Sequence, residues 1–263
     1  MNWPFKDCRY PLHGKDILDP IKLPGPISEG TVHLWIADLK AWSKHAENLE
    51  SILSEEERER LDKLKVIDKR EEFLCSRGIL RIILSGYIAQ DPRDLPLKHS
   101  PTGKPFLPQA RIQFNLSHSG DIFACGICIN NQIGLDIQEI YPISSLDRII
   151  NNFFSSTEIQ YLATLPSREL YQEHFFAIWA AKEAYLKAVG DGIQESFNQH
   201  SIIPESPDLS SFRLEHPAPK RDELVWTINA LNVGQGFHAA LAYDGDLKEL
   251  ERYEIAPENF FIA

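Results

Sequence analysis

The 263-residue sequence predicts an α+β protein built from two similar α/β subdomains. Two observations predict this class. A strand, a long helix and further strands follow one another in the same order in each half of the chain. The chain also has 43% hydrophobic residues, enough to bury one large core or two smaller ones. We place an extended proline-rich arm at residues 1–30, an N-terminal subdomain at 31–130 and a C-terminal subdomain at 131–263. No repeat at the level of individual residues is evident.

The first half begins with a predicted strand at residues 31–37, where hydrophobic residues alternate with others. Ser54 followed by three glutamates is typical of a helix start, and the helical pattern continues with little interruption to about Tyr87. Residues 111–118, 122–129 and 133–138 are three short segments of strand character separated by tight turns. They predict an antiparallel meander.

The second half, which begins with the strand at residues 133–138, is predicted to contain two helices and two further strands. The helices cover residues 156–165 and 174–189, and Gly190 is a plausible cap of the second. The strands cover residues 225–233 and 237–243. The long helix therefore lies near the middle of this half, before these two strands.

Composition and charge exclude several classes of protein. The net charge of −11 argues against general nucleic-acid binding, which depends on a basic surface. The longest apolar runs are far shorter than the roughly 20 residues that a membrane span needs. Residues 1–12 lack the basic start and apolar run of a secretory signal. We expect a cytoplasmic protein with no membrane and no nucleic-acid partner.

The motif from Cys125 to Cys128 resembles a redox or zinc pair, but its position argues otherwise. It lies within a predicted strand, where residues three apart point to opposite faces. No second pair of this kind occurs in the sequence. We therefore predict that both thiols are packing residues.

A predicted strand carries the first candidate site. Asp136 and Gln138 share one face of the segment, beside Gly134, which would leave room for a ligand. Two side-chain oxygens on one surface suit a metal ion. The alternative is an ordinary edge strand with a solvated polar face.

The helix around residue 180 carries the second candidate site. Lys182 falls in an apolar stripe with Phe175 and Trp179, which is costly unless the ammonium has an anionic partner or reaches water. Glu183 and Lys187 lie beside that stripe; the alternative for this pair is a helical ion pair four residues apart. That alternative does not account for Lys182.

Other polar residues extend this pattern. Arg77 occupies an apolar stripe of the first long helix, so it is either paired internally or turned toward an anion. Ser117 and His118 are neighbours in a strand and point apart, which excludes a hydrolase nucleophile and base. Two acids with several lysines suit a magnesium-dependent reaction on a phosphate anhydride.

Four motifs in order then carry a family resemblance. They are Gly103-Lys104-Pro105, Phe114-Asn115-Leu116-Ser117-His118-Ser119-Gly120, Ile133-Gly134-Leu135-Asp136, and Trp179-Ala180-Ala181-Lys182-Glu183-Ala184-Tyr185-Leu186-Lys187. Their order and spacing resemble the Sfp-type 4′-phosphopantetheinyl transferases over residues 31–243. The resemblance implies a pseudo-twofold pair of α/β subdomains with coenzyme A in the cleft between them. It also implies transfer of phosphopantetheine from coenzyme A to a carrier-protein serine, which releases adenosine 3′,5′-bisphosphate.

The resemblance also implies roles for individual residues. Glu183 would be the base that takes the serine proton, and Lys187 would stabilise the leaving nucleotide. The implied Mg²⁺ ligands are Asp136, Gln138 and Glu183. The implied coenzyme A contacts are Arg58, Arg60, Arg77, Lys104, Ser117, His118, Lys182 and Lys187. Many bacterial members have a glutamate where this chain has Gln138, so we expect an active enzyme with weaker metal affinity.

The implied partner is an apo acyl or peptidyl carrier protein with an acidic helix beside its serine. Because this chain is itself acidic, docking requires a local basic or apolar patch. We place it at residues 141–156, with Phe153 or Phe154 as anchors unless both belong to the core. We expect a monomer. Two alternatives remain: a catalytically weakened homologue that only binds carrier proteins, and a coenzyme-binding hydrolase.

Overall fold

The computed structural model describes residues 26–190, 197–215 and 225–260, so most of the proline-rich arm lies outside the described residues. The elements of the first half are β1 (Thr31–Asp38), α1 (Leu39–Ser43), α2 (Ala46–Ser51), α3 (Glu55–Lys63), α4 (Ile67–Ile88), η1 (Pro92–Asp94), β2 (Lys98–His99), β3 (Pro105–Phe106), β4 (Ile112–Ser119) and β5 (Ile122–Ile129). Those of the second are β6 (Ile133–Glu139), α5 (Leu146–Phe153), α6 (Ser156–Ala163), α7 (Arg168–Val189), β7 (Ser201–Pro204), β8 (Ser211–Glu215), β9 (Trp226–Leu231), β10 (Phe237–Asp244), β11 (Glu249–Glu254) and η2 (Pro257–Asn259).

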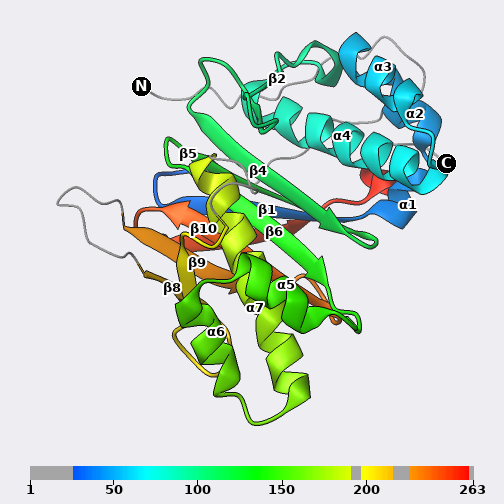
Figure 1. Ribbon diagram of the computed structural model, residues 1–263. Helices are drawn as coiled ribbons and strands as arrows, with labels where there is room; N and C mark the ends of the chain where they lie inside the picture. Colours follow the sequence, from blue (N-terminus) through cyan, green and yellow to red (C-terminus); the bar gives the residue numbers. More distant parts are fainter. Residues whose placement is uncertain (1–25, 191–196, 216–224, 261–263) are drawn as a thin grey trace.

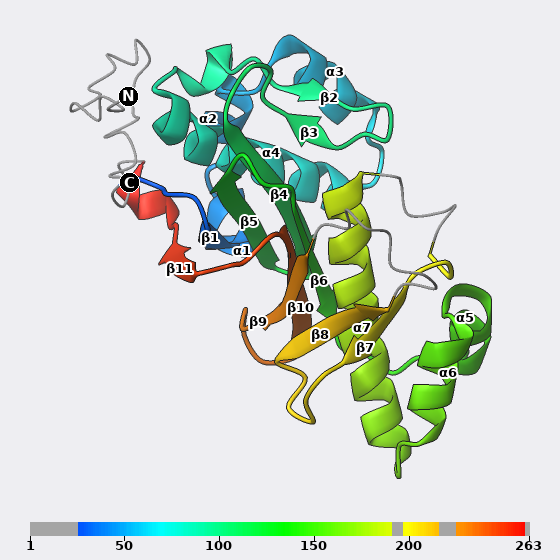
Figure 2. The same cartoon turned by 90° about the vertical axis from the view of Figure 1, so that its left-hand side faces the viewer.

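The molecule is an α+β fold with two sheets packed face to face between two long helices (Figures 1 and 2). The first sheet has the order β11-β1-β5-β4 and the second the order β6-β10-β9-β8-β7. One hydrophobic cluster packs α4 on the first sheet, and another packs α7 on the second. A third cluster fills the space between the sheets, with residues from β1, β5, β6 and β10. The predicted fold class is confirmed.

The three-stranded meander is wrong in its last strand. β4 and β5 form the predicted hairpin, but β6 pairs with β10 in the second sheet. The chain changes sheets at residues 130–132, where Asn130 adopts a positive φ of 65°. The change allows the apolar side chains of β6, such as Leu135, to face the core between the sheets. β11 lies in the predicted C-terminal subdomain, but it pairs in parallel with β1 of the first sheet.

The two halves contain one repeated unit that the sequence pattern did not reveal. α3 and α6 both begin with a capping box, formed by Ser54 with Glu57 and by Ser155 with Glu158. Each glutamate pairs with a buried cation 24 residues later on the following 22-residue helix. The cations are Arg81 and Lys182. Short capped helix, long helix and buried ion pair thus recur at one constant offset, in agreement with a pseudo-twofold arrangement.

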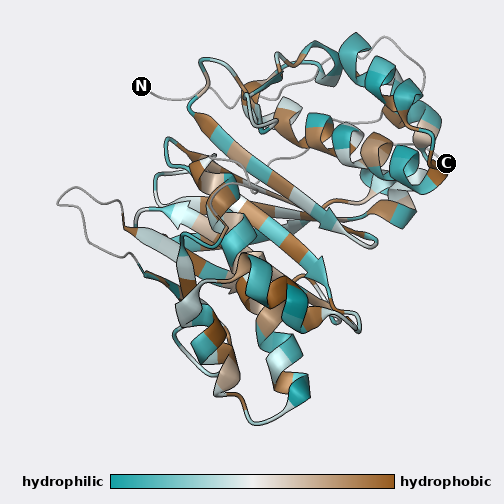
Figure 3. Ribbon diagram, viewed as in Figure 1, coloured by the Kyte–Doolittle hydropathy of each residue, from teal (hydrophilic) through white to brown (hydrophobic). Residues whose placement is uncertain are grey.

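The long helix predicted from Ser54 to Tyr87 is interrupted. α3 ends at Lys63, and α4 begins at Ile67, with Leu64 and Val66 in extended backbone. Leu61 is fully buried, and its carbonyl accepts hydrogen bonds from the Leu64 N–H and from Arg70. α3 is almost entirely hydrophilic (Figure 3). The break between the helices allows α3 to bury its one leucine while α4 packs along the hydrophobic core.

The cysteines of β5 lie as predicted. Cys125 packs between α4 and the first sheet, whereas Cys128 packs between the two sheets, on the opposite face of the strand. Both thiols are buried and free, and burial raises the pKa of each. Within the described residues, no helix combines the length and the apolar character that crossing a bilayer requires.

Candidate active site

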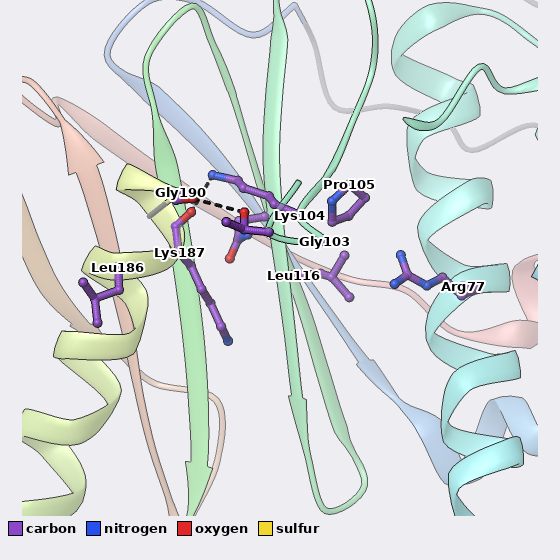
Figure 4. A pocket seen from close by; sticks show the side chains of 10 residues that line it. Arg77, Gly103, Lys104, Pro105, Leu116, Leu186, Lys187 and Gly190 are labelled. Carbon is purple, nitrogen blue, oxygen red and sulfur yellow. Dashed lines mark hydrogen bonds between the residues drawn. The ribbon is translucent and has the colours of Figure 1, made fainter. Parts of the chain in front are cut away.

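A cavity of about 300 Å³ lies where the two halves meet. Its walls come from α4, the loop after β2, strand β4 and the last turn of α7 (Figure 4). Arg77 extends into it from the α4 side, facing Leu116, and Lys104 extends toward the end of α7. The lining residues are Arg77, Thr102, Gly103, Lys104, Pro105, Asn115, Leu116, Leu186, Lys187 and Gly190. Three of the four sequence motifs therefore contribute residues to one cavity.

Side chains supply the hydrogen-bond partners for the backbone groups on the edge of β6 that faces β4. Three backbone N–H groups of β6 donate to polar side chains of β4: Leu135 to Asn115 Oδ1 at 2.8 Å, Ile137 to Ser117 Oγ at 3.2 Å, and Glu139 to Ser119 Oγ at 3.0 Å. Two carbonyls of β6 accept from lysines: Ile133 from Lys104 at 2.9 Å and Leu135 from Lys187 at 3.2 Å. Alternating polar side chains of β4 take the place of backbone-to-backbone hydrogen bonds. The two sheets are therefore connected along this edge but do not form one continuous sheet.

The centre of the site is a cluster of two acids and a lysine. Lys187 Nζ lies 2.5 Å from Asp136 Oδ1 and 3.8 Å from Glu183 Oε2. Burial and the nearby Asp136 carboxylate raise the pKa of Glu183 to about 7. Trp179 holds this carboxylate from one turn earlier, donating its indole N–H to Glu183 Oε1 at 2.8 Å. A carboxyl group with a pKa near neutrality, fixed in position, is suited to accept a proton.

Gln138 lies beside this cluster as predicted, and its amide nitrogen donates to Asp136 Oδ2 at 2.6 Å. In this arrangement it is a hydrogen-bond partner of the carboxylate. Gly134 does not leave room for a ligand, contrary to the sequence interpretation. A Cβ there would lie 1.9 Å from the Ala184 carbonyl oxygen, so the missing side chain allows α7 to pack directly on β6.

Ser117 and His118 point apart, as predicted for neighbours in a strand. The Ser117 hydroxyl donates to Asp136 and accepts from Ile137 N and Lys187, which uses its full capacity. Its position therefore fits the orientation of Asp136 better than the predicted contact with a phosphate.

His118 points to the other side of the strand. Its Nδ1 lies 3.3 Å from a carboxylate oxygen of Glu72 on α4, and the second oxygen of Glu72 binds Lys69. Burial lowers the pKa of His118, an effect that Glu72 opposes. The ring is partly exposed and turned toward the α4 side of the site.

Lys182 lies elsewhere than predicted. Its ammonium is 1% exposed and bonds both oxygens of Glu158, at 2.7 and 2.9 Å, together with the His200 carbonyl. The sequence argument that this lysine needs an anionic partner was right, but the partner is Glu158 in the core and not a nucleotide phosphate. The residue ties α6, α7 and β7 together.

A group of cations lies on the α4 side of the cavity. The guanidinium groups of Arg60 and Arg77 both lie over the Phe73 ring, 5.2 and 5.5 Å from its centroid. Burial lowers the pKa of Arg77, and among the described residues Arg77 makes no ion pair. Burial and then Arg77 lower the pKa of His99. Arg58 is exposed on α3, two residues from Arg60, and therefore points away from it.

The sequence-based predictions give no role to four residues of the site: Glu72, His99, Asn115, and Trp179 as a hydrogen-bond donor. Glu72 and His99 carry no local signal because each becomes relevant only through a residue distant in sequence. Asn115 and Trp179 were quoted within motifs but were given no role. The alternation of Asn115, Ser117 and Ser119 along β4 was the one available signal, since three polar residues on one strand face require polar partners.

Comparison with known proteins agrees with this geometry. Residues 132–242 match the model of the 4′-phosphopantetheinyl transferase superfamily, and residues 35–127 match that of the 4′-phosphopantetheinyl transferase N-terminal region. The chain is 37% identical to 4′-phosphopantetheinyl transferase HetI of Nostoc sp. over 166 residues, covering 62% of this chain and 70% of that protein. It is 30% identical to 4′-phosphopantetheinyl transferase psf-1 of Bacillus pumilus over 190 residues, covering 72% of this chain and 80% of that protein. The chain therefore belongs to the 4′-phosphopantetheinyl transferase superfamily, as an Sfp-type member.

Proposed function

We propose that this protein transfers the 4′-phosphopantetheine group of coenzyme A to a serine of an apo acyl or peptidyl carrier protein, in a Mg²⁺-dependent reaction. Its superfamily, shown by two family models and several relatives, supports the transfer reaction. The observation that carries the proposal is the Asp136–Lys187–Glu183 cluster beside a cavity between the two halves.

Coenzyme A occupies the cavity in this proposal, with its nucleotide toward α4. Arg60 and Arg77 form a pair of cations over Phe73, with the neutral His99 ring near Arg77, and this group suits the 3′-phosphate. His118 and Lys187 face the diphosphate from opposite sides. Arg58, exposed on α3, contributes through its charge at longer range.

The reaction forms one bond and breaks one bond. The oxygen of the carrier serine attacks the β-phosphorus of coenzyme A, and the bond from that phosphorus to the bridging oxygen breaks. The serine proton passes to Glu183, directly or through a water, and adenosine 3′,5′-bisphosphate leaves with the bridging oxygen. Trp179 fixes the Glu183 carboxylate in position for this transfer. The three donors of Lys187 bind Ser117, Leu135 and Asp136, so its positive charge stabilises the leaving nucleotide without a direct hydrogen bond.

The residues around Asp136 fit a magnesium ion. Burial and then repulsion by the nearby Asp136 raise the pKa of Glu183, and a divalent cation would relieve the repulsion. These two carboxylates would hold the ion, and Gln138 would orient Asp136 through its amide. When bound, Mg²⁺ supplies positive charge to the phosphate oxygens. Replacement of a glutamate by Gln138 removes one negative charge and so weakens metal affinity.

The carrier protein docks on the C-terminal half in this proposal. Exposed apolar side chains there include Tyr141, which is 56% exposed, and Phe153, which is 41% exposed. Phe153 packs edge-on against Trp179, the residue that holds Glu183, so the surface adjoins the site. Phe154 is 4% exposed and belongs to the core, so Phe153 is the candidate anchor of the two.

Intact-mass spectrometry tests the reaction. An apo carrier protein incubated with the enzyme, coenzyme A and Mg²⁺ should gain the mass of one phosphopantetheine. Glu183→Gln should lose the activity, as should wild type after chelation of the metal. Glu169→Gln, which removes an exposed carboxylate from the first turn of the same helix, is the matched control and should stay active.

The competing function is that of a weakened homologue that only binds carrier proteins. No comparison supports it, and the central acids and Lys187 are present. Absence of any mass gain with fatty-acid, polyketide and peptidyl carriers would favour it. In that case Gln138→Glu is the first variant to examine.

A further inference from the structure

Among the described residues, the acceptors of the Lys104 ammonium are all backbone carbonyls of the opposite half. Its ammonium donates to Lys187 O at 2.7 Å, Ile133 O at 2.9 Å and Ala188 O at 3.4 Å. An ammonium group has three donors, so these bonds use all of them. No donor remains for the phosphate contact that the sequence resemblance implied.

The acceptors include carbonyls that would otherwise lack partners. α7 ends at Val189, with Gly190 as its left-handed cap, so the last carbonyls of the helix have no intrahelical donor. Lys104 supplies donors to two of them and places a positive charge at the negative end of the helix dipole. Thr102, from the same loop, donates to the Gly190 carbonyl at 3.1 Å. The loop after β2 thus caps the long helix of the other half.

The capped residue carries the central cation of the site. Lys187 donates its ammonium to Asp136. Its own carbonyl accepts a hydrogen bond from Lys104 (Figure 4). The helix has little freedom to slide along β6, because Gly134 brings the two backbones into direct contact. Loss of the cap would therefore allow the last turn of α7 to fray, and the Lys187 ammonium would move with it.

We infer that Lys104 is a positioning residue: it caps α7 across the cleft and thereby fixes Lys187 against Asp136, and it does not bind coenzyme A phosphates. The expected effect of Lys104 on catalysis rests on the proposed transferase function, whereas its expected effect on the stability of α7 does not. The adjacent Pro105 and Gly103 shape the loop that delivers it, and Gly103 has a positive φ of 86°.

Three variants test the assignment. Lys104→Met removes the ammonium and keeps an unbranched apolar stem, Lys104→Arg keeps the charge, and Thr102→Val removes the weaker cap bond. Each purified protein is measured for its ligand-free Tm, its Kd for adenosine 3′,5′-bisphosphate by calorimetry at two salt concentrations, and its kcat and KM well below Tm. The salt comparison reports how many cations contact the ligand's phosphates.

Lys104→Met should lower the ligand-free Tm by at least about 3 °C. It should lower kcat about tenfold or more, because Lys187 is misplaced, while Kd and its salt dependence stay within about threefold of wild type. Thr102→Val should shift Tm and kcat in the same direction by less, and Lys104→Arg should restore part of both. A normal Tm with weakened, less salt-dependent nucleotide binding would overturn the inference. If no variant and no wild type transfers phosphopantetheine, the Tm results still decide the capping role, and only the proposed function fails.

Discussion

Gly134 lies where strand β6 meets helix α7, two residues before Asp136. The contact between the two backbones is closer than any side chain permits, since a Cβ at this position would lie 1.9 Å from the Ala184 carbonyl oxygen and 2.5 Å from Ala188 N. This approach allows Lys187 on the helix to meet Asp136 on the strand. The glycine of the Ile-Gly-Leu-Asp motif is thus a packing requirement of the site.

Gly134→Ala should destabilise the protein by about 3 kcal/mol or more, because a methyl group there forces α7 away from β6. Gly126→Ala on β5 is the matched control. Its Cβ would meet the flexible end of Ile133 at 3.0 Å, so it should cost less than about 1 kcal/mol. Urea unfolding measures both. Equal losses would show that the backbone contact at Gly134 is not the constraint.

Glu72 acts on the site through His118. Its carboxylate lies 3.3 Å from the ring and favours the protonated imidazole, the form that would attract a phosphate. Glu72→Gln should raise the KM for coenzyme A by roughly two- to fivefold, the size expected for a half-exposed ion pair, with little change in kcat. The effect should be larger at pH 6 than at pH 7.5, because burial lowers the pKa of His118 and the ring is neutral at pH 7.5 with or without Glu72.

The control for this prediction is Glu71→Gln, which removes the neighbouring exposed carboxylate of the same helix. It should leave KM unchanged. If both variants shift KM equally, the cause is the general field of α4 and not the contact with His118.

The helix pairs α3–α4 and α6–α7 share one stabilising device. In each, the glutamate of a capping box also accepts a hydrogen bond from a buried cation of the long helix, Arg81 in one half and Lys182 in the other. Each glutamate thereby fixes the start of a short helix and its docking on a long one. Both charged groups are buried, so removing one partner leaves the other uncompensated.

Lys182→Met should therefore lower the free energy of unfolding by about 3–5 kcal/mol. Arg81→Met should have an effect of similar size, because it breaks the equivalent pair of the other half. Under conditions where it is folded, Lys182→Met should bind adenosine 3′,5′-bisphosphate with unchanged Kd by calorimetry. If Lys182→Met is instead as stable as wild type but binds the nucleotide more weakly, the result would support the contact between Lys182 and a phosphate that the sequence resemblance implied.

The two halves are joined by a strand that pairs outside its own half: β11 follows the strands of the second sheet in sequence but pairs with β1 of the first. A buried polar group lies beside this pairing. His33 of β1 bonds Tyr87 of α4 at 2.7 Å, and its other ring nitrogen lies 3.6 Å from Glu251 of β11.

Burial lowers the pKa of His33 to about 4, although Glu249 opposes the shift. As pH falls from about 6.5 toward 4, the unfolded chain binds a proton at this histidine that the folded protein excludes, so stability falls. Urea unfolding at pH 7.5, 6.0 and 4.5 should show this loss in wild type. His33→Gln, less stable at pH 7.5, should lose less over the same range. Parallel pH curves for the two proteins would exclude His33 as the titrating group.

Local patterns were sufficient for much of the fold. Strand patterns bounded by turn signals predicted β1, β4, β5, β6, β9 and β10, and the capping serine predicted the start of α3. These features depend on residues close in sequence, where periodicity and capping act directly. The opposite placement of Cys125 and Cys128 followed from strand geometry alone. The family, and with it Asp136, Glu183 and Lys187 as a group, followed from four ordered motifs.

Only the tertiary structure decided which partner each polar residue meets. Lys182 and Lys104 are both motif lysines, yet one is buried against Glu158 and the other caps α7. Their partners lie 24 and 83 residues away in the sequence, and Glu72 meets His118 only because α4 packs beside β4. A sequence shows that a buried charge requires a partner, because desolvation is costly. It does not show which partner, because long-range packing brings the two groups together.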